Sequence, residues 1–443
     1  VAARISTPAS GAVWSIAINP ANPNNAFVVE WNNYESPDLY VTNDLGQHWS
    51  TVNINCPVQT VAYSVVTSTL YAGCDGVLYQ SPDNGGTWNQ VSGAVWDVRQ
   101  ILPDFGGVTG SLAIGSEQGV FLGNNQGSTW QSLNGNIAAS VTLGVAVVGN
   151  FILTVAEDLG PLTARHAGEI WSSLNSSYPP GEGGVGIYNP VNIEYGYFFT
   201  PVNGLQYSIN NGKAFQSATG LPGSEFPTYA GNGDLLAGDL QNPSNVYAAG
   251  VDGIFKSTDW GITWALQAWP ISTPVMVGVD PSNSATIFVG QQNGQLLVSH
   301  DGGNTFAQTK LACSNCGWPV SVTVEPSNSQ LVLIGMSQPP PNGGILVSID
   351  GGANFVPSNS GIKPSTNLCQ TAAVPRVRFD PSGAPIMAAA TNSGLYVSSD
   401  LGSSWSNVQN NVVPSIFTGV EWASGDLWAS TCGEGIVRTP FAQ

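Results

Sequence analysis

The chain has few charged side chains and very few basic ones. In 443 residues, charged residues make up 9%, and 10 Lys and Arg stand against 28 Asp and Glu, for a net charge of −18. Phosphate backbones are bound by clusters of Lys and Arg, so this balance argues against nucleic acid as a partner. No apolar run reaches about 18 residues, so no membrane insertion is expected.

Histidine is nearly absent, and the usual metal and cofactor patterns are missing. The three His residues are His48, His166 and His300, and none follows a metal-ligand spacing or belongs to a nucleophilic triad. Phosphate-binding loops are also lacking. The sequence therefore predicts neither a metal nor a cofactor.

Cysteine is scarce but even in number, with six residues and no paired CxxC zinc pattern. We expect local disulfides at Cys313–Cys316 and Cys56–Cys74, and a third at Cys369–Cys432. Disulfides and a first residue that is not Met favour a mature secreted chain. The scarcity of basic groups favours an acidic extracellular habitat, with an ordinary secreted acidic protein as the alternative.

One eight-residue pattern recurs through the chain. Its Asp can accept hydrogen bonds from the backbone of its own turn, its Gly can take a positive φ, and its aromatic residue can return to the core. Copies occur at 42–49, 81–88 (SPDNGGTW), 257–264, 299–306, 348–355 and 398–405; Asn replaces Asp at 123–130 and 208–215, and a decayed copy ends at Trp171.

The spacing of these copies predicts an all-β fold. The terminal aromatics are 39 to 50 residues apart, the length of a four-stranded propeller blade, and short apolar runs with turn residues lie between them. A tenth repeat follows the last copy but lacks its outer strand. We therefore predict one domain, residues 1–443, as a single ten-bladed β-propeller whose last blade is completed by the N-terminal strand 2–6. Two smaller rings are the alternative.

The pattern resembles the Asp box, or BNR repeat, of the Asp-box β-propellers. The blade count is similar to that of sortilin-type receptors, which bind peptides in a ten-bladed ring. The blade sequence at 70–81 (LYAGCDGVLYQS) resembles xyloglucanase-type enzymes of glycoside hydrolase family 74, in which an Asp just after the second strand is catalytic. That resemblance implies a role for Asp75 and, less well, for Asp252 or Glu30. The pattern matches sialidases poorly, since it lacks their arginine set and has too many repeats.

Blade geometry separates the acidic residues into two groups. Asp-box and Pro-turn acids share one face and are expected to be structural, whereas turns between the second and third strands of each blade lie on the other face, around the funnel. Acids in those turns could supply the acid and base of an inverting glycosidase, or could be ordinary solvated turn residues. The candidate catalytic residues are Asp75, Glu117, Glu30 and Glu157, and the candidate substrate-binding residues are Trp31, Asp252 and Glu434.

These residue types favour a secreted glycoside hydrolase that cleaves a β-linked polysaccharide by carboxylate acid–base chemistry. Trp31 lies beside Glu30, where a flat aromatic face could stack on a sugar ring. The alternative is a non-catalytic extracellular binding or surface-assembly protein with a glycan or peptide in the funnel. A wide ten-bladed funnel would hold the acids far apart, which favours binding.

Overall fold

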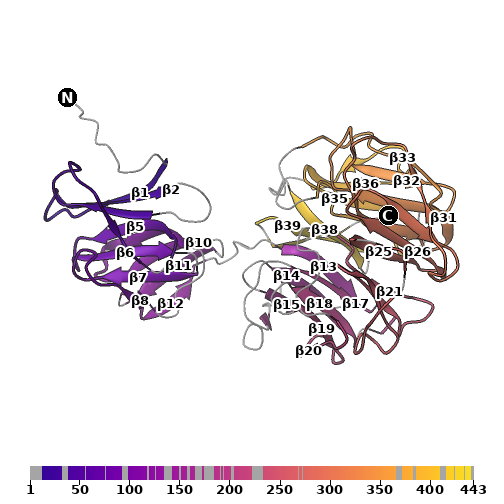
Figure 1. Ribbon diagram of the computed structural model, residues 1–443, viewed down its shortest axis with the longest axis horizontal. Helices are drawn as coiled ribbons and strands as arrows, with labels where there is room; N and C mark the ends of the chain where they lie inside the picture. The colour runs from indigo at the N-terminus through magenta and orange to yellow at the C-terminus, as the bar shows by residue number, and fades with distance from the viewer. Residues whose placement is uncertain are drawn as a thin grey trace. The chain divides into compact units, whose positions relative to one another are not determined.

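The computed structural model is an all-β protein that divides into two compact units, residues 1–139 (unit 1) and 140–443 (unit 2) (Figure 1). The structure describes residues 12–31, 38–54, 56–74, 76–91, 98–116, 119–124, 126–133, 142–148, 151–156, 160–164, 172–173, 184–189, 191–192, 194–200, 204–221, 233–267, 269–271, 273–365, 372–382, 386–409, 416–423, 425–433 and 435–440.

Unit 1 contains three four-stranded antiparallel sheets, each formed by strands that follow one another in the chain. The first strands of the three sheets pack side by side, and Val61 N–H donates to Ser15 Oγ (3.1 Å) between the first two sheets. The elements are β1 (Ala12–Ile18), β2 (Ala26–Trp31), β3 (Asp38–Thr42), β4 (Ser50–Val52), β5 (Val58–Ser64), β6 (Thr69–Cys74), β7 (Val77–Ser81), β8 (Asn89–Val91), β9 (Val98–Pro103), the 3₁₀ turn η1 (Phe105–Gly107), β10 (Leu112–Ser116), β11 (Gly119–Asn124) and β12 (Thr129–Ser132).

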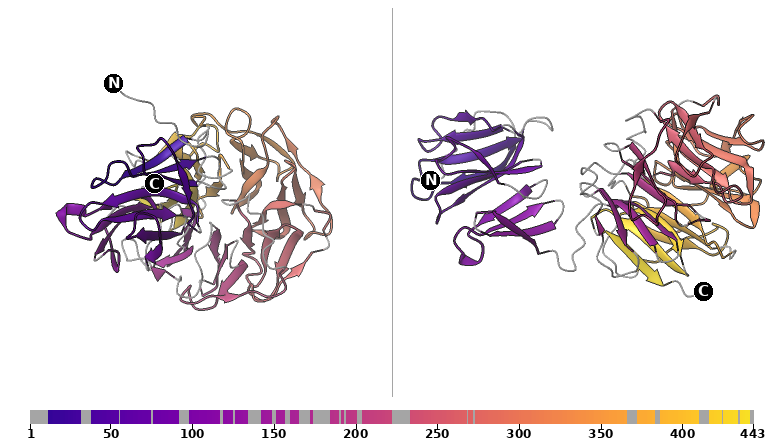
Figure 2. Two further views of the ribbon diagram at one scale, coloured as in Figure 1. Left: turned by 60° about the vertical axis from the view of Figure 1, so that its left-hand side comes forward. Right: turned by 90° about the horizontal axis from the view of Figure 1, so that it is seen from below.

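Unit 2 repeats the same antiparallel sheet, and Figure 2 shows its sheets standing side by side. The first three sheets comprise β13 (Thr142–Val148), β14 (Phe151–Ala156), β15 (Gly160–Ala164), β16 (Ser172–Ser173); β17 (Val185–Tyr188), β18 (Gly196–Thr200), β19 (Gly204–Ser208), β20 (Gln216–Ser217); and β21 (Leu236–Gly238), β22 (Val246–Gly250), β23 (Gly253–Ser257), β24 (Ala265–Leu266).

The remaining sheets of unit 2 include one with a fifth strand and one with three described strands. They comprise β25 (Pro274–Asp280), β26 (Asn283–Gln291), β27 (Leu296–Ser299), β28 (Ala307–Gln308); β29 (Lys310–Leu311), β30 (Pro319–Glu325), β31 (Asn328–Met336), β32 (Ile345–Ser348), β33 (Asn354–Pro357); β34 (Arg376–Phe379), β35 (Met387–Thr391), β36 (Gly394–Ser398), β37 (Ser406–Asn407); and β38 (Phe417–Ala423), β39 (Asp426–Thr431), β40 (Ile436–Pro440).

The seven sheets of unit 2 follow one another in a cycle. The first strands β13, β17, β21, β25, β30, β34 and β38 each pack on the next, and β38 and β39 pack on β13. At this seam Thr431 N–H donates to Thr142 Oγ1 (3.1 Å), and the Thr418 hydroxyl donates to Thr142 O. Two glycines let the strands approach, since a Cβ on Gly419 would lie 3.2 Å from Gly144 Cα.

This seam bears on the predicted single ring of ten blades. The described residues form ten sheets, of which three belong to unit 1 and seven to the cycle in unit 2. The ten-membered ring is not confirmed, because β38 of the last sheet packs on β13 of the fourth. The predicted closing strand, residues 2–6, lies outside the described residues.

Apolar strands buried on both faces form the interior of each unit. All five residues of β22 (VYAAG) are buried, as expected of a continuous apolar run bounded by turns. The outermost strands are short and exposed, for example β24 and β37, which limits the unpaired edge that each sheet presents. Disulfides join Cys56 to Cys74 and Cys313 to Cys316, which confirms two of the three predicted pairs. Cys432 is also disulfide-bonded, and its predicted partner Cys369 lies outside the described residues.

The recurring Asp turns share one hydrogen-bond pattern. In the copy at 299–306, Asp301 Oδ1 accepts from Thr305 N–H (2.8 Å) and Ser299 Oγ–H (2.8 Å), while Asp301 Oδ2 accepts from Thr305 Oγ1–H (2.7 Å). The same i+4 backbone bond occurs at Asp44, Asp83, Asp259, Asp350 and Asp400. The Asp carboxylates are thus held by their own turns, as predicted.

These bonds lower the pKa of the turn carboxyls and predict resistance to acid. The bonds from Thr305 lower the pKa of Asp301 to about 2, and those from Asn354 do the same for Asp350. A depressed pKa contributes stability above the unfolded pKa, which is lost as the pH falls through the folded pKa. We therefore expect the Tm, followed by calorimetry, to hold from about pH 7 to about pH 4 and to fall between about pH 4 and pH 2. Unfolding already complete at about pH 4 would contradict this.

Two adjacent glycines of one turn should differ sharply in their tolerance of alanine. Both have positive φ, +73° at Gly302 and +92° at Gly303, but a Cβ on Gly302 meets nothing within 4 Å, whereas one on Gly303 would lie 2.2 Å from the Trp269 ring. We expect Gly302→Ala to cost about 1 kcal/mol of unfolding free energy from backbone strain. Gly303→Ala should cost roughly 2–5 kcal/mol, because overpacking adds to strain. Equal losses in urea denaturation would contradict this account.

Candidate functional site

Most of the predicted site residues lie outside the described part of the chain. These are Asp75, Glu117, Glu157 and Glu434. Asp252 is exposed in the turn between β22 and β23, and Trp31 is the last residue of β2. Glu30, in unit 1, does not lie in a turn as predicted, because the strand extends past it: it is part of β2 and is buried at 0% exposure. Glu30 belongs to unit 1 and Asp252 to unit 2.

Glu30 nevertheless has an acidic neighbour that the sequence analysis did not select. The register of β2 and β3 places Glu30 directly opposite Asp38, so both side chains leave the same face of the sheet. Asp38 is half-buried, and its Oδ2 accepts a hydrogen bond from Tyr40 Oη (3.2 Å). Burial and the negative charge of Asp38 raise the pKa of Tyr40, which therefore stays a donor. The sequence signal that could have identified this pair is an acid at each end of the connection between β2 and β3, namely Glu30 and Asp38.

An exposed aromatic residue lies on the strand next to this pair. In β1, Val13 pairs with Glu30 and Ser15 pairs with Val29, so Trp14 is the extra residue of a β-bulge. Trp14 is 55% exposed. Bulges commonly turn a side chain toward a site.

A second candidate site is a central cavity in unit 2. Its volume is about 510 Å³, and it is lined by residues on or next to the seven first strands. Aliphatic residues such as Val277 and Val322 form much of the wall, and Pro281, Pro326 and Pro381 belong to turns that follow these strands. The cavity therefore lies on the Pro-turn side of the sheets, the side that the sequence analysis had set aside as structural.

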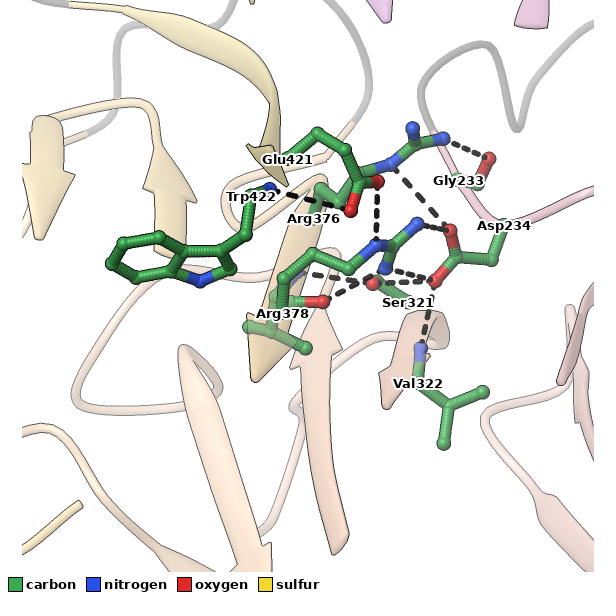
Figure 3. Close-up of polar contacts among 9 residues, drawn as sticks. Gly233, Asp234, Ser321, Val322, Arg376, Arg378, Glu421 and Trp422 are labelled. Carbon is green, nitrogen blue, oxygen red and sulfur yellow. Dashed lines mark hydrogen bonds and ion pairs between the residues drawn. The ribbon is translucent and has the colours of Figure 1, made fainter. Parts of the chain in front are cut away.

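Four charged residues meet in this cavity, one from the segment just before β21, two from β34 and one from β38 (Figure 3). Arg378 Nη2 donates to Asp234 Oδ1 (2.7 Å), Arg378 Nη1 donates to Asp234 Oδ2 (3.1 Å), and Arg378 Nε donates to Glu421 Oε2 (3.2 Å). Arg376 Nε lies 3.5 Å from Asp234 Oδ1. Asp234 Oδ2 also accepts from Ser321 Oγ–H (2.6 Å), so Asp234 connects β30 to β34. We call these four charged residues the cavity network.

The network keeps its buried groups ionised. Burial alone would raise the pKa of Asp234, but Arg378 and Arg376 outweigh it and hold that pKa below its ordinary value. Burial disfavours the charge of Arg378, yet Asp234 and Glu421 together raise its pKa. Burial and the nearby charge of Arg378 lower the pKa of Arg376. A general acid must exchange a proton near the working pH, so the Arg-bound Asp234 is suited to fixing geometry and binding rather than to proton transfer.

Sequence reasoning missed the cavity network. Its one local signal is Arg376-Val-Arg378, which sets two arginines two residues apart on a first strand, where the preceding repeat has Ser321 and Thr323. A period of two puts both side chains on one face. In the part of the chain that the structure describes, no group of three or more His, Cys, Asp or Glu could hold a metal ion. No helix within the same residues is long and apolar enough to cross a bilayer.

Comparisons with known proteins place the chain near one group of structures at low similarity. No protein-family model and no curated protein matches it. The GH74 enzyme of Niastella koreensis is 15% identical, with 97% of this chain and 84% of that chain covered and a TM-score of 0.26. The GH74 xyloglucanase of Xanthomonas campestris is 12% identical (96% and 90% covered, TM-score 0.34), and an ancestral GH74 enzyme is 13% identical (97% and 76% covered, TM-score 0.34). Since every TM-score is below 0.5, the proposals below rest on the chain's own residues.

Proposed function

We propose that the protein is a secreted glycan-active protein, specifically a glycoside hydrolase that cleaves a β-linked polysaccharide with Glu30 and Asp38 as its two carboxyl groups. The observation that carries this proposal is the cross-strand pairing of the two acids. Like charges placed directly opposite destabilise a pair of strands. A pair that lowers stability in this way is typical of a site kept for its chemistry.

The surroundings of the two carboxyl groups suggest a division of roles. Glu30 is fully buried, whereas Asp38 is half-buried and accepts a hydrogen bond from Tyr40. In glycosidases the more deeply buried carboxyl commonly acts as general acid, and the more solvated one acts as nucleophile. Glu30 would thus protonate the leaving oxygen, and Asp38 would attack the sugar. The exposed Trp14 would offer an aromatic face to a sugar ring.

The register also favours one stereochemical course. Directly opposite residues have Cβ atoms roughly 4.5–5.5 Å apart, which suits the separation of about 5–5.5 Å between carboxyls in retaining enzymes better than the about 6.5–9.5 Å of inverting ones. The inverting course expected from acids on neighbouring blades is therefore replaced here by a retaining one. The two disulfides agree with an oxidising, extracellular location.

The test is a panel of plant and microbial β-linked polysaccharides, assayed for new reducing ends from about pH 2 to pH 7. We expect product from at least one polysaccharide, and NMR of the first product should show the β-anomer, because double displacement retains configuration. An α-anomer would contradict the roles given to Glu30 and Asp38. Absence of product across the panel would contradict hydrolysis and leave the non-catalytic alternative, in which the protein binds a glycan or peptide.

A further inference from the structure

The central cavity of unit 2 has the properties of a ligand site that is separate from the Glu30–Asp38 pair. Its volume of about 510 Å³ is in the range of small-molecule sites, and a few polar groups converge at one part of an otherwise apolar wall. The walls include Val147, Leu236 and Val324, and Trp422 lies beside the polar part (Figure 3). An occupant must therefore present apolar surface along most of its length.

The cavity network is electrically balanced. Two guanidinium groups, from Arg376 and Arg378, face two carboxylates, from Asp234 and Glu421. A cationic or anionic ligand head would leave one charge without a counter-charge in a buried site, which carries a large free-energy penalty. The charge balance favours an uncharged head group.

One oxygen of the network is open to a donor. Glu421 Oε2 accepts from Arg378 Nε (3.2 Å), but Glu421 Oε1 accepts one long bond, from Trp422 N–H (3.4 Å). The Glu421 side chain lines the cavity and is 27% exposed, whereas those of Asp234 and Arg376 are 6% and 2% exposed. Arg378 directs both of its Nη groups to Asp234. Glu421 Oε1 is thus the polar atom of the network best placed to receive a hydrogen bond from a ligand.

We propose that this cavity binds a small amphipathic molecule with an apolar body and a neutral head that donates a hydrogen bond to Glu421 Oε1. A primary alcohol is the simplest member of this chemical class. The proposal does not depend on the hydrolase proposal, because it uses no residue of unit 1.

Four linear probes of similar overall length and different heads test the proposal. Octanol, octylamine, octanoate and heptyl methyl ether are titrated into the full-length protein by calorimetry at neutral pH. We expect octanol to bind at least about tenfold more tightly than octylamine and octanoate, since both are charged. The ether lacks the donor and should bind several-fold more weakly than octanol.

Two variants locate the binding. Ala237→Leu places a larger side chain in the cavity and should weaken octanol binding by about tenfold. Ala214→Leu, at an exposed position that does not line the cavity, should leave the affinity for octanol unchanged. Glu421→Gln leaves the cavity network with an excess positive charge. The affinity for octanoate should therefore rise relative to the affinity for octanol. Thermal melting shows whether each variant is folded.

Three results would overturn the proposal. These are no octanol binding up to its solubility limit, octylamine or octanoate binding as tightly as octanol, or equal weakening by Ala237→Leu and Ala214→Leu. The last result would mean that the probes bind to exposed apolar surface rather than in the cavity.

Discussion

Replacing Asp234 with alanine is expected to destabilise unit 2 by about 3–5 kcal/mol. The change leaves Arg376 and Arg378 buried beside each other without their shared counter-charge and removes the acceptor of Ser321 Oγ–H. Removing one partner of a buried ion pair is costly because the remaining charge is out of water. The measurement is the free energy of unfolding from urea denaturation.

Asp426 provides a matched control in the same unit. It pairs with Arg438, whose side chain is 46% exposed, so water screens that pair. Asp426→Ala should cost about 1 kcal/mol or less. In a double-mutant cycle, Asp234→Ala combined with Arg378→Met should cost less than the sum of the two single changes. The double variant no longer buries the Arg378 guanidinium, so the loss of the Asp234 carboxylate leaves one fewer charge without a partner. If Asp234→Ala costs no more than Asp426→Ala, the cavity network does not stabilise the ring.

Glu30→Gln is expected to lower kcat on the cleaved polysaccharide by about 10²–10⁴-fold, the usual contribution of a general acid. At a pH high enough to ionise both carboxyls, the same change should raise the free energy of unfolding by about 0.2–1 kcal/mol, since it then removes one of two like charges from directly opposite positions. Loss of activity together with a gain in stability separates a catalytic role from damage to the fold. Both quantities are measured on the purified variant, by reducing-end assay and urea denaturation.

The control for Glu30→Gln is Asp83→Asn in the same unit. Asp83 is held by its own turn through Thr87 and Ser81, and an Asn occupies the equivalent position in the turn at Asn210, whose Oδ1 accepts from Ala214 N–H (3.0 Å). Asp83→Asn should therefore leave kcat unchanged. Unaltered kcat in Glu30→Gln, or equal loss in both variants, would remove Glu30 from the proposed mechanism.

Features that depend on short stretches of chain could be predicted from the sequence. The bonds of each Asp turn lie within eight residues, as from Ser299 to Phe306, so residue type and spacing are sufficient to predict them. The same holds for the antiparallel strands between turns and for the disulfides Cys56–Cys74 and Cys313–Cys316. Glu30 became a candidate from its local sequence alone. Its pairing with Asp38 could be identified only from the register of β2 and β3.

The number of sheets in a ring was decided by tertiary packing. Ten similar repeats are compatible with one ring or with smaller groups, since each repeat makes the same local bonds. The seam between β13 and β38 depends on the close approach of Gly144 and Gly419, which are 275 residues apart in the chain (419 − 144). No local pattern marks these two glycines among the 53 in the sequence.

The sequence by itself thus determined the all-β repeat, its turns and its local cross-links, because those depend on neighbours in the chain. The tertiary structure decided which repeats close on one another and which charges meet. The cavity network joins Asp234, just before β21, to two arginines of β34 and to Glu421 of β38. These residues meet only because the sheets of unit 2 surround a common cavity.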